Sequence, residues 1–321
     1  MFVYGRVKSQ TRIVVIGICL VLTAGCSSIA RMGSVSAEEA FQSTLDVTGP
    51  LDLEVYTGSG AVQIYGTSGD QVEITGRLQV RSRPTARAEE RVREIESVPP
   101  IDQTGNRIVI GRSADNDLFE NISIAYEIGV PIETTVRAQT GSGRLDIRNL
   151  IGDVEARTGS GRVILRDIVG AVRTLTGSGG IEADAIAGSF NGRTGSGTLR
   201  LTQTDTGTVD VNTGSGGITL AGISGLLNAR TGSGRIQIEG NPAESWTLST
   251  GLGGVTIVLP ATADFDLNAD AGSGRVNVEA PFEFDGTTDR DRRQMRGSVG
   301  AGGPEVGVRT GSGSIRIGTG D

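Results

Sequence analysis

From about residue 140 onward the chain alternates apolar and polar residues in short runs that recur at a nearly constant interval. In the first of these units Leu145 and Ile147 stand on either side of a polar residue, and a second spaced pair, Val154 and Ala156, follows. Because successive side chains of a β-strand point to opposite faces, this alternation predicts half-buried strands. Each unit therefore supplies two short strands with one inward face apiece.

A tetrapeptide, Thr-Gly-Ser-Gly, stands at the same point of every unit. Copies begin at Thr57, Thr140, Thr158, Thr176, Thr194, Thr213, Thr231 and Thr310, with variants that begin at Thr250 and Ala271. From Thr140 the successive copies, variants included, are 18, 18, 18, 19, 18, 19, 21 and 39 residues apart. A fixed period of this length indicates a repeat architecture, in which stacked units share one continuous core.

Two all-β architectures fit this period. In a β-solenoid each unit of about 18 residues is one rung of a stack, and nine or so rungs would make a rod of roughly 45 Å at ~4.8 Å per rung. In an antiparallel meander or sandwich each unit is a hairpin with the glycines in its turn. Near-identical units favour the solenoid, because threonine side chains would stack into hydroxyl ladders. The glycines are then expected to supply the positive φ that tight corners require.

Residues 41–139 differ from the array and are expected to form a β-rich section that caps it, since an uncovered end would expose core and unpaired backbone. The tetrapeptide at Thr57 lies between two alternating runs, so this section contains one coil of the array. Strands are predicted at 45–47, 51–55, 62–64, 72–80, 108–110, 122–128 and 134–138.

The cap section also contains one predicted amphipathic helix, at about 85–98. Ala88, Val92 and Ile95 recur at helical spacing, Thr85 is a suitable N-cap, and Pro99 must end the helix. A second departure from the repeat, at about 280–304, is expected to be a solvated loop insertion in the array of residues 140–321.

The amino-terminal segment has the pattern of an export signal. Three basic residues precede an apolar run over 13–24, which is too short to span a bilayer. The run ends in Leu22-Thr23-Ala24-Gly25-Cys26, which resembles the bacterial lipoprotein signal, although Thr23 stands where leucine is usual. The resemblance implies a signal peptide over 1–25, a lipid with palmitate on Cys26, and a tether over 26–40. Ser27, being other than Asp, implies the outer membrane if the cell is Gram-negative.

The lipoprotein signal, the strand-rich start, Val130-Pro131 before the array and the recurring Thr-Gly-Ser-Gly-x-Ile-x-Ile units together resemble the bacterial putative-adhesin family of β-strand-repeat proteins. The resemblance covers about 41–321 and closes with Thr310-Gly-Ser-Gly-Ser-Ile-Arg-Ile. It implies a repetitive envelope protein and carries no catalytic signature.

The composition limits the metal, cofactor, nucleic-acid and catalytic roles that the chain could have. The chain contains no histidine, and an exported, lipidated chain would keep no free cysteine, so neither a metal site nor a cofactor is expected. A net charge of −7, which becomes more negative without the leader, argues against nucleic acid as a partner. Carboxylates that could serve a glycosidase or lyase are interpreted as solvated surface groups: Asp146, Glu155, Asp167, Glu182, Asp205 and Asp210.

Arginines flank the tetrapeptides and form the one candidate binding feature. Four directly precede a copy, namely Arg157, Arg193, Arg230 and Arg309, and four directly follow one, namely Arg144, Arg162, Arg235 and Arg275. In a solenoid they would form a basic stripe beside the corners, suited to sulfate or phosphate groups of a glycan or lipopolysaccharide. The alternative is that neighbouring carboxylates neutralise them.

These patterns favour a non-enzymatic, lipid-anchored envelope protein that offers an adhesin-like or structural surface to a glycan or protein partner. A carbohydrate-active enzyme of the β-helix type and an envelope-stress signalling component are the alternatives.

Overall fold

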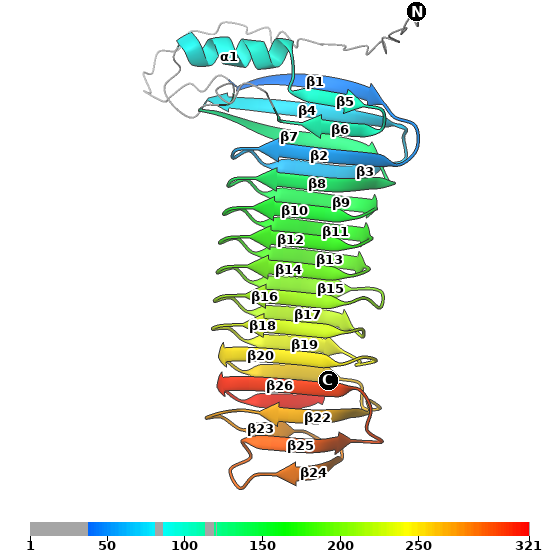
Figure 1. The fold of residues 1–321 in the computed structure, drawn as a ribbon, viewed down its shortest axis with the longest axis vertical. Helices are drawn as coiled ribbons and strands as arrows, with labels where there is room; N and C mark the ends of the chain where they lie inside the picture. Colours follow the sequence, from blue (N-terminus) through cyan, green and yellow to red (C-terminus); the bar gives the residue numbers. More distant parts are fainter. Residues whose placement is uncertain (1–37, 81–85, 113–118, 120, 321) are drawn as a thin grey trace, which may run out of the picture.

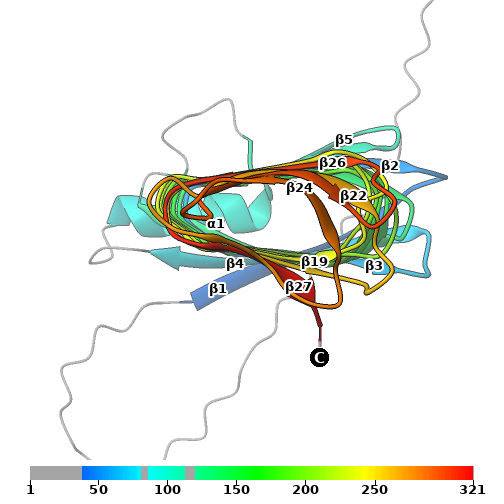
Figure 2. The same cartoon turned by 90° about the horizontal axis from the view of Figure 1, so that it is seen from below.

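The backbone is a tall stack of β-strands (Figure 1). The computed structural model describes residues 38–80, 86–112, 119 and 121–320. Viewed along the stack, the coils superimpose as a flattened oval with one sheet on each broad side (Figure 2). Neighbouring strands inside the array run parallel. The protein is therefore all-β and a β-solenoid, and the antiparallel meander is wrong.

The two broad sides of the oval are named sheet A and sheet B. Sheet A has thirteen strands, in spatial order β1 (Glu38–Asp46), β4 (Gln71–Val80), β7 (Ile122–Pro131), β3 (Val62–Thr67), β9 (Leu145–Ile151), β11 (Val163–Val169), β13 (Ile181–Ala187), β15 (Leu199–Gln203), β17 (Ile218–Ile223), β19 (Ile236–Gly240), β21 (Val255–Leu259), β27 (Ile315–Thr319) and β23 (Val276–Val278). Sheet B has fourteen, in order β24 (Phe284–Thr288), β25 (Gln294–Val299), β22 (Phe265–Asp270), β26 (Glu305–Ser312), β20 (Trp246–Leu252), β18 (Leu227–Thr231), β16 (Val209–Thr213), β14 (Phe190–Thr194), β12 (Val172–Thr176), β10 (Val154–Thr158), β8 (Thr134–Thr140), β2 (Leu51–Thr57), β6 (Arg107–Ile110) and β5 (Ile101–Thr104).

The core lies between the two sheets and is filled by the spaced apolar pairs of each unit. Equivalent residues fall directly above one another, as Val154 does between Val136 and Val172. Leu145 and Ile147 of the facing sheet are fully buried, as are the corresponding pairs of the other coils except Val278, which is partly buried. Each coil thus buries only a few aliphatic side chains, and stacking makes these into a continuous core.

The tetrapeptide threonines hold the corners between the end of a sheet B strand and the start of the next sheet A strand. In every copy from Thr140 onward that begins with threonine, the buried hydroxyl donates to the carbonyl of the last glycine of the neighbouring corner, as Thr158 does to Gly143 over 3.0 Å. The same hydroxyl accepts a hydrogen bond from its own corner, from Gly161 N–H over 3.0 Å. The predicted ladder therefore runs from hydroxyl to carbonyl rather than from hydroxyl to hydroxyl.

The corner glycines are required by close packing of successive coils. A Cβ atom on Gly161 would stand 1.7 Å from the carbonyl oxygen of Gly143. Of the tetrapeptide glycines only Gly253, Gly272 and Gly313 have a positive φ. The expectation that these glycines supply left-handed backbone is wrong for most copies, because the corner turns with ordinary dihedrals and leaves no room for a side chain.

The amino-terminal end of the rod is closed by a section that breaks the repeat. Strands β6 and β7 form a coil on one side of the β2–β3 coil, and β8 and β9 form the coil on its other side. Antiparallel β1 and β4 extend sheet A past β7. Helix α1 (Ala86–Ser97) packs on β1, with Val92 and Ile95 in the core, as its spacing predicts. Thr85, its expected N-cap, lies outside the described residues.

At the other end the order of stacking departs from the order of the chain. Strands β26 and β27 lie between the β20–β21 coil and the β22–β23 pair, so the last unit of the sequence is an interior layer of the rod. The expected loop at 280–304 contains a hairpin, β24–β25, that pairs antiparallel with β22. That segment is a loop only in part, because its strands cover the edge that β22 would otherwise expose.

The segment expected to be an export signal, Cys26 and the first eleven residues after it in the expected tether lie outside the described residues. Within the described part, no helix has the length and apolarity needed to cross a bilayer.

Candidate ligand-binding surface

The eight flanking arginines fall into two rows, one on each side of the tetrapeptide corners. Row B consists of Arg157, Arg193, Arg230 and Arg309, on β10, β14, β18 and β26 of sheet B. Row A consists of Arg144, Arg162, Arg235 and Arg275, each directly before a strand of sheet A. The sequence predicted one stripe, and the corner itself divides it.

Row B has an arginine on every second coil. Across sheet B the column reads Arg157, Leu175, Arg193, Asn212, Arg230, Ser249 and Arg309. At ~4.8 Å per strand, successive arginines of this row are therefore about 10 Å apart. The uncharged residues between them keep the guanidinium groups from crowding one another.

Three of the eight arginines are engaged by carboxylates. Arg144 binds Asp146 over 2.7 Å, Arg193 binds Asp210 over 3.4 Å, and Arg157 contacts Glu155. Within the described residues the other five form no ion pair: Arg162, Arg230, Arg235, Arg275 and Arg309. Neighbouring carboxylates thus neutralise part of the rows and leave the rest unpaired.

A groove opens in row A near the carboxy-terminal end of the rod. Its column reads Arg235, Gly254, Ser314 and Arg275 on successive strands, as the backbone hydrogen bonds between neighbouring coils show. The two small residues leave a gap between the arginines, which lie three strands, or about 14 Å, apart. Arg316 borders the gap from the next column, and the cavity has a volume of about 550 Å³. We call this site the distal groove.

Charge in the distal groove is predominantly positive. Arg316 binds Glu279 over 3.0 Å, whereas Arg235 and Arg275 form no ion pair within the described part of the chain. Every basic residue after position 8 is arginine, and none is lysine. The planar guanidinium suits bidentate hydrogen bonds to sulfate, phosphate or carboxylate groups. Arg316 lies beside Arg275 because β27 pairs with β23, a strand from an earlier unit of the chain. Sequence analysis therefore did not identify Arg316.

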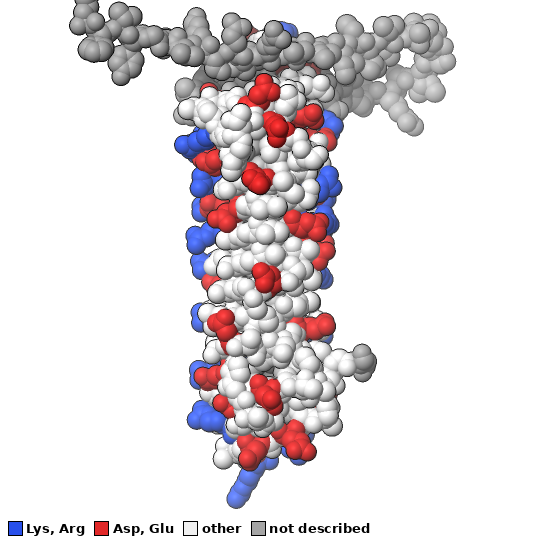
Figure 3. Space-filling model, turned by 90° about the vertical axis from the view of Figure 1, so that its right-hand side faces the viewer, with Lys and Arg blue, Asp and Glu red and all other residues white. Residues whose placement is uncertain are grey.

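The opposite edge of the rod has a different character. Figure 3 views that edge, where acidic and uncharged residues occupy the middle and basic residues lie along the two sides. The described turns there contain Asp153, Asp205 and Glu244 and no arginine, and Asp167 lies near them toward the end of β11. An anionic ligand is therefore favoured on the side of the tetrapeptide corners.

Sheet B has a second charged feature that sequence reasoning missed. Glu54 is almost fully buried, and its carboxylate accepts hydrogen bonds from Tyr56 at 2.7 Å, Arg107 at 2.6 Å and Arg137 at 3.1 Å. The hydrogen bond from Tyr56, followed by those from the arginines, holds the pKa of Glu54 below its usual value despite desolvation. Arg137 also forms an ion pair with Glu155 over 3.1 Å. This ladder alternates in sign and neutralises itself, so it stabilises the rod and offers little to a charged ligand.

The carboxylates considered for catalysis are spread over the surface. Asp146 and Glu182 lie on sheet A, Glu155 and Asp210 on sheet B, and Asp167 and Asp205 at the edge opposite the tetrapeptides. Within the described residues no three Asp or Glu side chains converge as metal ligands would.

The fold and these corners define a class of proteins, the parallel β-solenoids with short repeats. A family model described as Toastrack DUF4097 matches residues 51–318. The chain belongs to this family. Its model spans the array and most of the cap section.

Other comparisons add little. Among solved structures the chain is similar to a putative cell adhesion protein from Clostridium sporogenes ATCC 15579, with 15% identity over 89% of this chain and 100% of that one, and a TM-score of 0.22. A similarity this distant transfers no function. No match was found among curated proteins.

Proposed function

We propose that the protein is a non-enzymatic cell-envelope protein, anchored by lipid on Cys26, whose rigid rod presents an adhesin-like surface to an anionic glycan. The distal groove carries the proposal, since unpaired arginines there border a cavity of about 550 Å³. A protein partner in the envelope would have to offer the same anionic groups.

The position of the groove supports this role. Strand β1 begins at Glu38, twelve residues after Cys26, and twelve extended residues reach at most about 40 Å. The cap end of the rod would then lie toward the membrane, and the distal groove would stand near the far end (Figure 1). A contact site is most useful where the rod projects furthest from the bilayer.

The scatter of the carboxylates over two faces and an edge supports a binding role over hydrolysis. A glycosidase needs two carboxyl groups on either side of one scissile bond. A binding surface needs only charge, shape and repetition.

The test is retention of the purified protein on an immobilised sulfated polysaccharide, heparin, with neutral dextran as the reference matrix. The protein should bind to heparin and not to dextran. Salt should elute it from heparin, because salt screens ionic contacts. The triple variant Arg235→Ala, Arg275→Ala, Arg316→Ala should bind at least about tenfold more weakly, equivalent to about 1.4 kcal/mol.

A matched triple variant separates the groove from general charge. The control variant is Arg144→Ala, Arg157→Ala, Arg193→Ala. It also removes three positive charges, but from arginines that already form ion pairs, and it should retain most of the heparin binding. Equal losses in the two variants would refute a site in the groove. Failure of the parent protein to bind heparin at any salt concentration would refute the anionic-glycan proposal itself.

A further inference from the structure

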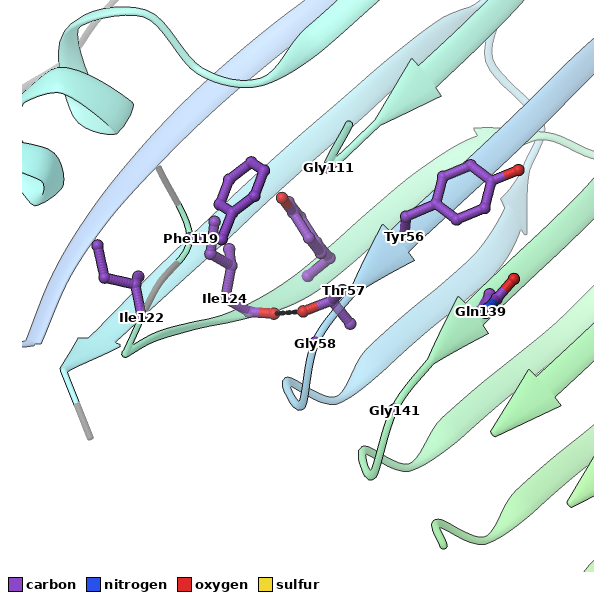
Figure 4. Close-up of a pocket in the computed structure, with 10 residues that line it drawn as sticks. Tyr56, Thr57, Gly58, Gly111, Phe119, Ile122, Ile124, Gln139 and Gly141 are labelled. Carbon is purple, nitrogen blue, oxygen red and sulfur yellow. Dashed lines mark hydrogen bonds between the residues drawn. The ribbon is translucent and has the colours of Figure 1, made fainter. Parts of the chain in front are cut away.

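A second cavity lies at the cap end of the rod, far from the distal groove. It has a volume of about 250 Å³ and opens between the end of β2 and the start of β7. Phe119, Ile122 and Ile124 lie on one side of it, and Tyr56 and Gln139 on the other (Figure 4). We call this cavity the cap pocket.

One polar group in the cap pocket has no partner among the described residues. Tyr126 lines the cavity and is only 2% exposed, and its hydroxyl forms no hydrogen bond to any residue that the structure describes. The hydroxyl lies close to Gly111, since a Cβ atom on that glycine would stand 3.4 Å from it. Gly111 has a φ of +79° and also lines the pocket, so bare backbone and the phenol share one wall. Buried hydroxyl groups are normally hydrogen-bonded.

The pocket favours an uncharged ligand. The described residues that line it include no Asp, Glu, Lys or Arg. Burial raises the pKa of Tyr126 above its usual range, so the phenol stays neutral and is able to donate one hydrogen bond. The hydroxyl of Tyr56 is already bound to Glu54, and the Arg112 guanidinium lies over its ring, 4.1 Å from the ring centroid, so Tyr56 offers the pocket no free hydrogen-bonding group.

The lining combines apolar side chains with a few polar groups, of which the Thr57 hydroxyl is already bound to the Ile124 carbonyl over 2.9 Å. Ile122, Ile124 and Phe119 provide an apolar wall, while Tyr126 and the exposed side chain of Gln139 provide hydrogen-bonding groups. Ligand sites are typically of this kind, and a volume just below the usual 300 to 1,000 Å³ suits a single ring. A sugar ring has the matching chemistry, with C–H groups on its faces and hydroxyl groups around its edge.

We propose that the cap pocket binds one neutral sugar ring, with the Tyr126 hydroxyl and the Gln139 amide bound to its hydroxyl groups and the apolar wall against its C–H face. This site is independent of the distal groove. Its ligand is neutral where that of the groove is anionic, and each site can be removed without altering the other.

The proposal is tested with the purified protein and a panel of neutral hexoses and N-acetylhexosamines, by saturation-transfer NMR and by the rise in Tm that ligand binding produces. At least one sugar should bind, and Tyr126→Phe should weaken it at least about tenfold, because one buried hydrogen bond is lost. Gln139→Ala, at the exposed rim, should also weaken binding without touching the core.

Two controls keep the result interpretable. Tyr65→Phe removes a phenol hydroxyl outside the pocket and should leave binding unchanged. The Tm of unliganded Tyr126→Phe should equal or exceed that of the parent, which shows that the loss is not one of folding. Sugar binding undiminished in Tyr126→Phe, binding of phenol but of no sugar, or no binding of any sugar to the parent would each overturn the proposal.

Discussion

The hydroxyl of Thr176 donates a hydrogen bond of 3.0 Å to the carbonyl oxygen of Gly161, fifteen residues earlier in the chain and one coil away. It also accepts one of 3.1 Å from the N–H of Gly179 in its own corner. A single buried oxygen thus links a corner to itself and to its neighbour, and the same pair of hydrogen bonds recurs at Thr158, Thr194 and Thr213.

Thr176→Val should destabilise the protein by about 1 to 3 kcal/mol, because it keeps the shape and leaves two buried backbone groups without a partner. Thr176→Ser, which retains the hydroxyl and loses one methyl group, should cost less. Chemical denaturation followed by circular dichroism compares the two variants. A valine variant as stable as the serine variant would contradict the assigned role of the hydrogen bonds.

Gly161→Ala should destabilise the protein by at least about 2 kcal/mol, since the new Cβ would stand 1.7 Å from Gly143 O and successive coils would have to separate. Gly58 is the first glycine of the tetrapeptide at the cap end and, unlike Gly161, has nothing within 4 Å of an added Cβ atom. Gly58→Ala is therefore the matched control and should be nearly neutral in thermal denaturation. Equal losses of Tm would mean that glycine is needed for backbone conformation instead.

Acid should weaken the cap section through Glu54. Its pKa is lowered in the folded state, so its stabilising contribution is complete above the usual pKa of a glutamate, roughly 4.3, and is lost as pH falls through the folded value. Glu54→Gln should therefore be much less stable than the parent at pH 7, and the difference in free energy of unfolding should shrink in acid. Glu239→Gln, at a position without an ion pair in the described residues, should show no such pH-dependent difference.

Cys26→Ser should release the protein from the membrane. The lipoprotein signal predicts that the thiol carries the lipid, so the variant should lose incorporation of labelled palmitate and appear in the soluble fraction after cell fractionation. Cys19→Ser, within the expected leader, is the control and should remain with the membrane. A Cys26→Ser protein that still labels with palmitate would show that the anchor lies elsewhere.

The sequence predicts the repeat well because one period determines both what is buried and where the chain turns. The spaced pairs, the stacking of the tetrapeptide threonines and the face of α1 all follow from local spacing, whereas the glycine carbonyls that the threonine hydroxyls bind do not. The reason for the corner glycines did not follow, since a clash with a carbonyl of another coil is visible only once coils are stacked. The buried charge of Glu54 was missed for a similar reason, as its arginines come from β6 and β8, which are distant in sequence.

The candidate sites were less accessible from the sequence than the fold. Arginines directly beside six of the ten tetrapeptides are visible in the sequence. Their division into two rows depends on whether each arginine precedes or follows the corner. The distal groove depends on the last unit lying between earlier ones, which no repeat count reveals. The cap pocket lies where the repeat is broken, and no motif marks it.

The placement of β26 and β27 also separates the order of synthesis from the order of assembly. A ribosome delivers the β22–β23 layer well before the layer that joins it to the rest of the rod, so that layer has nothing to dock onto until residues 305–319 emerge. A chain truncated before these residues would lose an internal layer of the rod and keep its terminal layer. The β20–β21 coil and the β22–β23 pair would then each expose an unpaired β-edge. Completion of the final unit is thus the event that seals this end of the molecule against edge-to-edge aggregation.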